Sequence, residues 1–259
     1  RRVLFRSTNI EYKNLYVDLD DTLISAYANQ RAAWSAVVAE MANDLRPLPA
    51  GALVDAIVAY ATEFWSDAER HRYWRQRLLP ARRTVVAGAL AALRSAGHSL
   101  PPPDFGDRLA DRFSRYREEQ MYLFDHAHEV LDALRTAGVA LALVTNGAAV
   151  DQRPKVTRFD LARRFDHIQI EGEHGFGKPE ERAYRHAAAC LGLTPAECWM
   201  VGDNLEWEVA APQRLGIFSV WYDGHGNGLP VETTIRPDLT IRSLRDVVHA
   251  FVRSGAAPD

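Results

Sequence analysis

The sequence has few of the features that would assign it to a specialised environment. Only two of its 259 residues are cysteines, and because Cys190 falls in a helical pattern and Cys198 at a strand start, we expect both to be small buried hydrophobes. The nine histidines show no metal-ligand spacing, which argues against a zinc site. No uninterrupted apolar run of about 18 residues predicts a transmembrane helix, and no signal peptide is visible. We therefore expect a cytoplasmic protein.

A strong charge of either sign is also missing. Lysine and arginine total 31, aspartate and glutamate total 34, and the net charge is −3. This balance argues against a nucleic-acid or membrane partner. With 47% hydrophobic and 25% charged residues, the composition is that of an ordinary globular protein. The length allows one large α/β domain, or a domain with an insert.

The first ten residues lack an initiator methionine. Within them, the tetrapeptide Leu4-Phe5-Arg6-Ser7 is what one reading frame of a common sequencing adapter encodes. We therefore treat residues 1–10 as a candidate non-native tail and leave them out of the fold.

The most informative segment that is present is 16–23, a short apolar strand that ends in three acids and a threonine. Acids crowded at the carboxyl end of a strand repel one another, so their charge must be neutralised. A divalent cation would do this and would also recruit a phosphate.

Three further motifs follow in order. The apolar run 139–144 reads as a buried parallel strand that ends at Thr145-Asn146-Gly147. The segment 175–179 contains Lys178 and precedes a helical pattern, and the apolar segment 198–203 closes on Gly202 and Asp203, with Glu208 five residues later. Together the four motifs resemble those of the haloacid dehalogenase (HAD) superfamily, over nearly the whole chain. One position departs from the pattern, because glutamate occupies position 208 where aspartate is usual.

Strand and helix patterns alternate from Asp125 onward, which predicts an α/β fold with a doubly wound parallel sheet and ligands at the carboxyl strand ends. Between the first two motifs the pattern is helical throughout, interrupted by prolines such as Pro47 and Pro101. We therefore predict a Rossmann-like core from residues 11–25 and 120–259 and an all-helical insert at 26–119. The resemblance identifies this insert as a C1 cap.

The resemblance also implies a role for each motif residue. Asp18 is the expected nucleophile, which forms an aspartyl-phosphate, and Asp20 is the expected general acid and base. Thr145 and Lys178 are expected to bind the phosphoryl oxygens. Asn146 and Gly147 are expected to contribute backbone N–H groups to the same oxygens.

The cofactor that the resemblance implies is Mg²⁺. Its expected ligands are Asp18, the backbone carbonyl of Asp20, and Asp203, with waters completing the octahedron. We expect Glu208 to act through a water or through Lys178 rather than as a direct ligand.

The function that these motifs favour is a Mg²⁺-dependent phosphatase acting on a small phosphorylated metabolite. A 2-haloacid dehalogenase is the main alternative, but halide leaves without protonation, so the presence of Asp20 favours phosphate. A phosphomutase and a catalytically silent binding protein also stay open. The sequence identifies neither the phosphomonoester nor the oligomeric state. Four arginines of the insert could contact an acidic substrate, but a solvated helix face is the favoured interpretation: Arg70, Arg72, Arg75 and Arg77.

Overall fold

The computed structural model describes residues 14–26 and 29–255, so the candidate tail at 1–10 lies outside the described residues. The chain divides into two compact units. The first comprises the described parts of Arg1–Ile24 and Leu123–Asp259, and the second is Ser25–Tyr122. The second unit is inserted into the first, between strands β1 (Asn14–Val17) and β4 (Ala140–Thr145).

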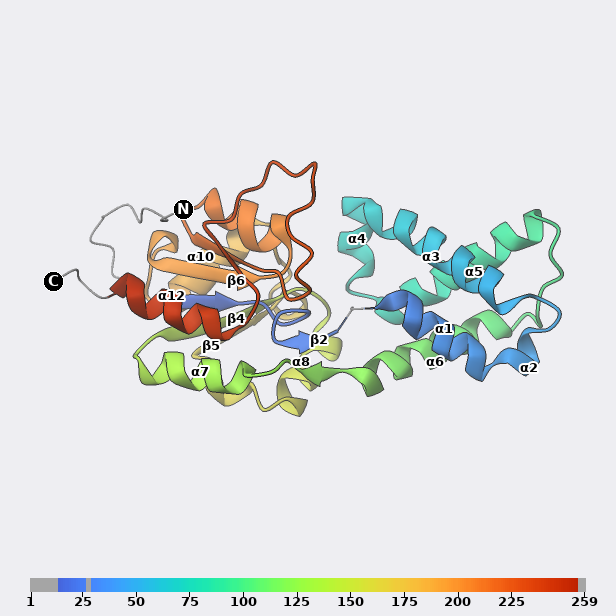
Figure 1. Ribbon diagram of the computed structural model, residues 1–259, viewed down its shortest axis with the longest axis horizontal. Coiled ribbons are helices and arrows are strands. Elements are labelled where there is room, and N and C mark those ends of the chain that lie inside the picture. The colour runs from blue at the N-terminus through green and yellow to red at the C-terminus, as the bar shows by residue number, and fades with distance from the viewer. Residues whose placement is uncertain (1–13, 27–28, 256–259) are drawn as a thin grey trace. The chain divides into compact units, whose positions relative to one another are not determined.

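The first unit is built on a six-stranded sheet in which every strand pairs in parallel with its neighbour. Helices lie on both of its faces (Figure 1). The predicted α/β fold with a doubly wound parallel sheet is thereby confirmed. The strand order is β5-β4-β1-β6-β7-β8, and the other four strands are β5 (His167–Ile170), β6 (Cys198–Gly202), β7 (Phe218–Tyr222) and β8 (Leu239–Ile241).

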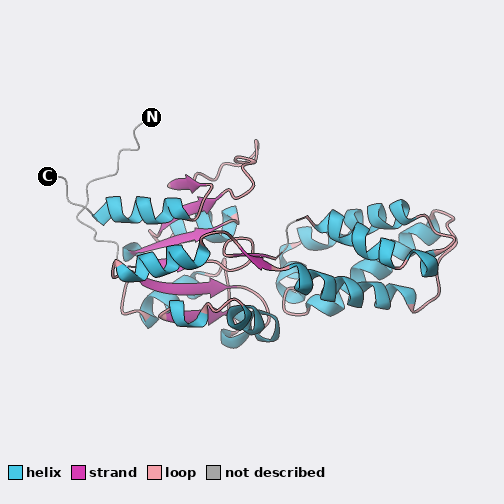
Figure 2. Cartoon of the chain, turned by 60° about the horizontal axis from the view of Figure 1, so that its bottom comes forward, coloured by secondary structure: helices cyan, strands magenta, loops and turns pink. Residues whose placement is uncertain are grey.

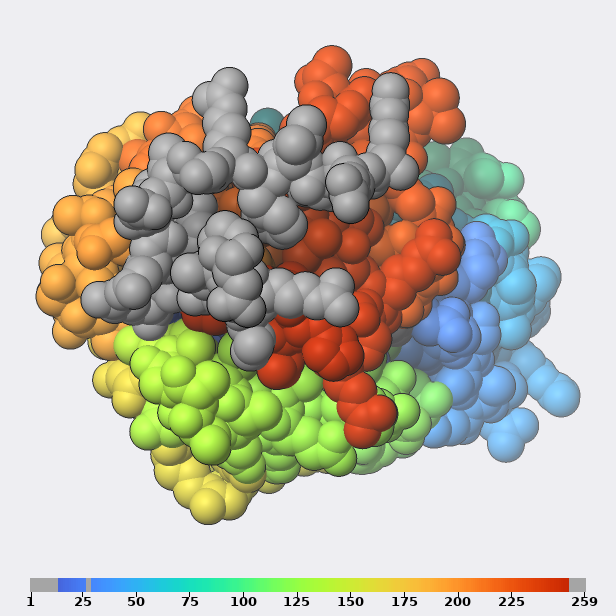
Figure 3. Space-filling model, turned by 60° about the vertical axis from the view of Figure 1, so that its left-hand side comes forward, coloured from blue at the N-terminus to red at the C-terminus, as the bar shows by residue number. Residues whose placement is uncertain are grey.

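Strands β4 and β6 are apolar along nearly their whole length because both faces of the sheet are covered. On β6, Met200 packs with Tyr184 and Ala187 of α10 (Glu181–Cys190). The preceding residue, Trp199, points to the opposite face, where its ring meets Phe251 of α12 (Arg245–Gly255) at 4.9 Å. Figure 3 shows α12 beside α7 (Ala127–Thr136) on the surface of this face.

The strand order indicates where on this sheet a ligand would bind. From β1 the strands run outward to β4 and β5 on one side, and to β6, β7 and β8 on the other. The order therefore reverses at β1, and the carboxyl end of β1 lies between those of β4 and β6. In open parallel sheets, ligands bind at such a reversal.

The first unit also contains helix α10, which begins at Glu181, and a π-helix at Leu205–Ala210 that is followed by the short α11 (Ala211–Gln213). The Asn204 side chain accepts the N–H groups of Glu206 and Trp207 at 3.0 Å each, which fixes the start of this turn. The others are α8 (Ala149–Arg158), α9 (Glu171–His174) and 3₁₀ turns at Ala162–Arg164 and Pro195–Glu197.

The second unit is helical (Figure 2) and has its own apolar core. Within that core, the rings of Trp34 and Phe113 stack in nearly parallel planes. The segments that lead into and out of the unit, β2 (Ile24–Ser25) and β3 (Tyr122–Leu123), pair with each other. Its helices are α1 (Gln30–Glu40), α2 (Ala42–Leu45), α3 (Ala50–Ser66), α4 (Ala68–Trp74), α5 (Leu78–Ser95) and α6 (Phe105–Gln120).

Two expectations from composition have different outcomes. Among the described residues, no helix is long and apolar enough to span a membrane. Cys198 is buried as predicted, but the prediction for Cys190 is wrong, because this thiol lies on the exposed side of the end of α10.

Candidate active site

The site is formed by loops at the carboxyl ends of three neighbouring strands. Asp18 follows β1, Thr145 ends β4, and Asp203 follows β6. The Asp18 N–H donates to the Val201 carbonyl at 3.0 Å, so the β1–β6 ladder continues to Asp18 and fixes its backbone. The sheet topology thus brings together three side chains whose positions span 185 residues of the sequence, from Asp18 to Asp203.

Lys178 is the centre of the charged network. Its ammonium group lies 2.5 Å from Asp18 Oδ1 and 2.7 Å from Glu208 Oε1. The lysine and glutamate side chains are each 1% exposed, so these ion pairs are shielded from water. On the other side of Asp18, the buried Thr22 hydroxyl donates to Oδ2 at 3.3 Å. Two groups therefore orient the Asp18 carboxylate.

Glu208 reaches Lys178 because the π-helix turns it back over the end of β6. Its second oxygen, Oε2, accepts the Asn204 N–H at 2.7 Å, so both carboxylate oxygens are bound. Gly202 leaves the space for this side chain: a Cβ there would lie 2.1 Å from Glu208 Cγ. Glu208 was expected to act through a water or through Lys178, and its Oε1 lies 2.7 Å from the Lys178 ammonium.

The site contains more acid than base. Three carboxylates (Asp18, Asp203 and Glu208) face the single ammonium of Lys178. Burial, followed by the charges of Glu208, Asp18 and Asp21, raises the pKa of Asp203 to about 9. Burial also raises the pKa of Glu208 to about 7, with Lys178 opposing the shift. An unbalanced group of oxygen donors that resists ionisation is the donor set that a hard divalent cation stabilises. Asp18, Asp203 and the carbonyl of Asp20 therefore fit Mg²⁺.

Asp20 is held by helix α8. Lys155 Nζ lies 2.7 Å from Asp20 Oδ1, and the two side chains are 8% and 13% exposed. Gln152 Nε2 donates to Asp20 Oδ2 at 2.8 Å. The charge of Asp20 is still close enough to raise the pKa of Asp18, after the larger effect of burial. Asp20 is thus held near Asp18 by two side chains of one helix.

Gln152 also links Asp20 to the end of β4. Its Nε2 lies 2.8 Å from Thr145 Oγ1 and 2.6 Å from the Asn146 carbonyl. With Asp20, three oxygens surround this nitrogen, and two of them, the Asp20 carboxylate and the Asn146 carbonyl, can only accept. The amide nitrogen rather than the amide oxygen must therefore face them. The loops that follow β1 and β4 are thereby joined through one side chain.

The Asn146 side chain joins the second and third motifs. Its Nδ2 donates to the Lys178 carbonyl and its Oδ1 accepts the Lys178 N–H, both at 2.8 Å. A Cβ at Gly177 would lie 2.5 Å from Asn146 Oδ1, so glycine is needed next to this amide. Asn146 therefore fixes the backbone from which Lys178 extends.

Gly147 has a different partner from the one expected. Its N–H donates to Glu171 Oε2 at 3.0 Å, and its carbonyl accepts the Gly172 N–H at 2.9 Å. Glu171 is buried at the carboxyl end of β5. Use of this N–H by a phosphate oxygen would require Glu171 to release it.

The four arginines in the helical unit have mixed environments. Arg75 is buried. Arg72 and Arg77 are exposed, and Arg77 lies over the Tyr73 ring at 4.1 Å. Arg70 lies 5.6 Å from the Phe64 ring centroid. Trp65 and Trp74 pack against the core of this unit.

Sequence reasoning missed three residues of this network, Gln152, Lys155 and Glu171, and assigned no contact to Thr22 of the first motif. A signal existed for Glu171, which is an acid directly after a strand, like Asp18 and Asp203. Gln152 and Lys155 are separated by three positions on one helix, so they share a face. Their approach to Asp20 depends on how α8 packs, which no local pattern encodes.

Comparison with protein families yields one match to most of the chain. A model described as hydrolase, haloacid dehalogenase-like hydrolase, matches residues 12–216. This range includes all four motifs and every residue of the charged network described above.

Individual proteins agree with this match. The chain is 32% identical to a phosphoserine phosphatase of Thermus thermophilus, over 92% of this chain and 98% of that protein. It is 26% identical to the pyrimidine 5′-nucleotidase PynA of Streptococcus pneumoniae, over 93% and 95%. The fold resembles that of the HAD hydrolase YfnB of Bacillus subtilis, solved with magnesium bound, with a TM-score of 0.67, 21% identity, and coverage of 93% and 99%.

Proposed function

Because this chain belongs to the haloacid dehalogenase-like hydrolases, we propose that it is a Mg²⁺-dependent phosphatase that hydrolyses a small phosphomonoester through an aspartyl-phosphate. The observation that carries the proposal is the pair of anchored aspartates. Asp18 is bound by Lys178 and Thr22, and Asp20 is bound by Lys155 and Gln152. Two acids two residues apart, with separate partners, can take separate roles in one reaction.

Asp18 is the nucleophile of the proposed reaction. One of its oxygens attacks phosphorus opposite the leaving oxygen, and an aspartyl-phosphate results. Lys178 fixes Oδ1 of this carboxylate, and its positive charge offsets the repulsion between the carboxylate and the incoming phosphate. The Thr22 contact to Oδ2 is long at 3.3 Å, so that oxygen is the less tightly held of the two.

Asp20 moves the protons. It donates a proton to the leaving alkoxide and then accepts one from the water that hydrolyses the aspartyl-phosphate. Lys155 and Gln152 hold its carboxylate beside Asp18. A halide needs no such proton, so an anchored Asp20 favours phosphate transfer over dehalogenation.

The phosphoryl oxygens are the proposed ligands of Lys178 and of the Thr145 hydroxyl. Thr145 is 2% exposed, and its hydroxyl is oriented by Gln152. The backbone of Asn146 and Gly147 forms the rest of the proposed phosphate-binding site. Because the Gly147 N–H donates to the Glu171 carboxylate, a phosphate oxygen would have to replace Glu171 there.

Mg²⁺ is the proposed cofactor, held by Asp18, the Asp20 carbonyl and Asp203. When bound, it neutralises the acids and so permits a carboxylate to approach a dianionic phosphate. Glu208 supports this site indirectly, because both of its oxygens are already engaged by Lys178 and Asn204.

The substrate class is a small phosphorylated metabolite. The relatives named above act on phosphoserine and on pyrimidine nucleotides, which differ in everything except the phosphomonoester. We therefore propose the monoester group as the common determinant. Residues outside the charged network would then determine which monoester is hydrolysed.

A substrate panel tests the proposal. Phosphoserine, nucleoside 5′-monophosphates and other phosphorylated metabolites are incubated with the protein, with and without Mg²⁺, and phosphate release is measured. In parallel, halide release is measured from 2-chloropropionate. The proposal expects phosphate release that requires Mg²⁺ and no halide. Halide release without phosphate release would favour a dehalogenase, transfer of phosphate between positions of one sugar would favour a mutase, and no turnover would favour a binding protein.

A further inference from the structure

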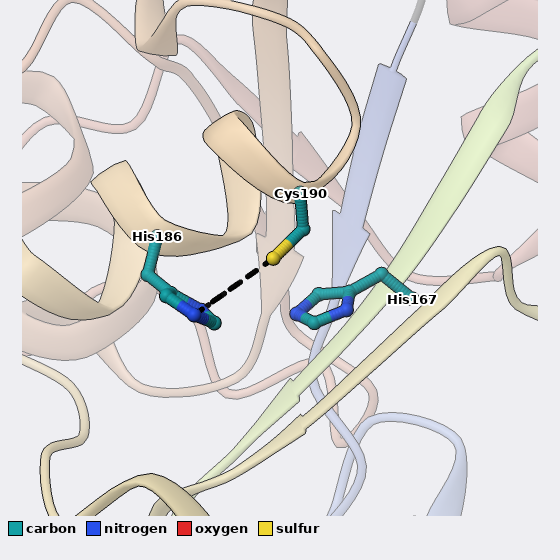
Figure 4. Close-up of side chains that lie close together, drawn as sticks. All are labelled: His167, His186 and Cys190. Carbon is teal, nitrogen blue, oxygen red and sulfur yellow. Dashed lines mark hydrogen bonds between the residues drawn. The ribbon is translucent and has the colours of Figure 1, made fainter.

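A second group of potential metal ligands lies away from the acidic site. His167, at the start of β5, faces His186 and Cys190 on α10 (Figure 4). One ligand atom from each of the three side chains lies within 4.8 Å of the others. Cys190 Sγ is 3.8 Å from both ring nitrogens of His186. Although the spacing of histidines in the sequence argues against zinc, the fold brings these three together.

One ring nitrogen of this group of side chains is buried without a hydrogen-bond partner. His167 Nε2 has no hydrogen-bond partner among the described residues, although it is shielded from solvent. A buried polar nitrogen without a partner is destabilising, and such a group requires an explanation. A metal ion between the three side chains would supply the missing partner.

The orientation of His186 suits this role. Gln169 Nε2 donates to the Ala183 carbonyl at 2.9 Å, so its oxygen faces His186 Nδ1 at 2.8 Å as an acceptor. Nδ1 therefore carries the proton, and Nε2 keeps its lone pair. Metal-binding histidines are commonly oriented in this way by a hydrogen bond from the other ring nitrogen.

Both imidazoles also favour the neutral form that a metal requires. Burial lowers the pKa of His167; a side-chain hydrogen bond with Gln169 opposes this shift, and the charges of His186 and His174 add to it. Burial, followed by the charges of His174 and Arg182, lowers the pKa of His186. Neutral histidines do not have to lose a proton before they coordinate.

We propose that His167, His186 and Cys190 bind a single transition-metal ion of borderline softness, of which Zn²⁺ is the representative. In a tetrahedral zinc site, neighbouring ligand atoms are about 3.3–3.6 Å apart, given Zn–N and Zn–S bonds of about 2.0–2.3 Å. The cluster must therefore contract by about 1 Å, which side-chain torsions can supply. The His174 ring, whose centroid is 4.8 Å from that of His186, or a water completes the coordination.

This site is separate from the acidic site in position and in chemistry. His167 begins β5, whereas Glu171, which contacts the Gly147 N–H, directly follows its last residue, so His167 lies about 13 Å from Glu171 along the strand. Its nitrogen and sulfur donors select a borderline-soft metal, whereas the oxygen donors of the other site suit Mg²⁺. A bound ion would clamp the end of α10 to β5.

Cobalt spectroscopy tests this proposal. Co²⁺ is titrated into the whole chain in excess Mg²⁺, with a phosphine as reductant so that no added thiol competes. Thiolate ligation gives a charge-transfer band in the near ultraviolet, and tetrahedral geometry gives intense visible bands. We expect both to saturate at one equivalent, and Zn²⁺ to abolish them and raise the melting temperature.

Two variants and a control distinguish the outcomes. Cys190→Ser alters an exposed side chain, so it should fold, lose the charge-transfer band and bind Zn²⁺ at least about tenfold more weakly. His186→Ala should lose the visible bands as well. His98→Ala, which removes an exposed histidine of the helical unit, should behave like the unaltered protein. Absent bands in the unaltered chain, or identical spectra from Cys190→Ser, would overturn the proposal.

Discussion

The contact between Glu208 and Lys178 makes a sharp prediction about catalysis. Glutamine at position 208 keeps the length of the side chain and can still occupy the space over Gly202, but it has no charge. Lys178 contacts Asp18 at 2.5 Å and Glu208 at 2.7 Å. In the glutamine variant, Asp18 is the only one of these two partners that still carries a charge. We expect Glu208→Gln to lower kcat/KM about 10- to 100-fold, as is typical when a group supporting a catalytic residue is lost. This corresponds to about 1.4–2.7 kcal/mol of transition-state stabilisation.

A shorter acid at position 208 separates the effect of the charge from the effect of side-chain length. Glu208→Asp keeps the charge but retracts the carboxylate by about 1.5 Å, the length of one carbon–carbon bond. The 2.7 Å contact with Lys178 would lengthen to about 4 Å, beyond hydrogen-bond range. The lost methylene also leaves a small void over Gly202, at a cost of about 1 kcal/mol. We expect this variant to lose at least as much activity as the glutamine variant, and to be less stable.

The assay is steady-state phosphate release from the best ester of the substrate panel, together with urea unfolding of each variant. Glu206→Gln is the matched control. Glu206 lies on the same π-helix and pairs with Arg214 at 3.0 Å, but both side chains are about half exposed, so its loss should change stability by less than about 1 kcal/mol and leave kcat unchanged. If Glu208→Gln and Glu206→Gln have equal kcat/KM, Glu208 does not position Lys178 and the reasoning is refuted.

Four further outcomes are expected. Asp18→Asn should lower turnover by at least ~10³-fold in the phosphate assay without unfolding, and near-normal turnover would contradict its role as nucleophile. EDTA should abolish phosphate release, Mg²⁺ should restore it and Ca²⁺ should inhibit; full activity without metal would favour dehalogenation. Asp20→Asn should slow alkyl phosphates far more than p-nitrophenyl phosphate, whose leaving group needs no proton, whereas equal losses would make Asp20 structural. Gly202→Ala should lower both the melting temperature and kcat, because its Cβ would overlap Glu208 Cγ; unchanged values would mean that Glu208 moves freely.

The fold was predictable because its signals are local. The strands that carry Asp18, Thr145 and Asp203 are short apolar runs ending in polar residues, and parallel sheets collect such ends at one edge. The helical insert was predictable from periodicity and prolines. Its chain connections β2 and β3 were not, since each has only two residues and no periodicity can appear in so short a segment.

The contacts within the site were predictable only in part. Lys178 was assigned from its motif, but its double ion pair depends on the π-helix that returns Glu208 over Gly202. That turn is set by the Asn204 side chain and has no sequence period of its own. Lys155 and Gln152 reach Asp20 across more than 130 residues, so their role follows from tertiary packing alone.

The pairing of β2 with β3 also has a consequence for how such a protein can change during evolution. The chain leaves the sheet unit after Ile24 and returns at Leu123, and the Phe124 N–H donates to the Leu23 carbonyl at 2.8 Å. Departure and return therefore occur side by side, as they would in a hairpin. Insertions whose ends lie close together can be exchanged, enlarged or shortened without disturbing their host. The helical unit, which has its own core, is in this sense a replaceable module, and its sequence can diverge while the sheet edge that carries Asp18, Thr145 and Asp203 stays the same.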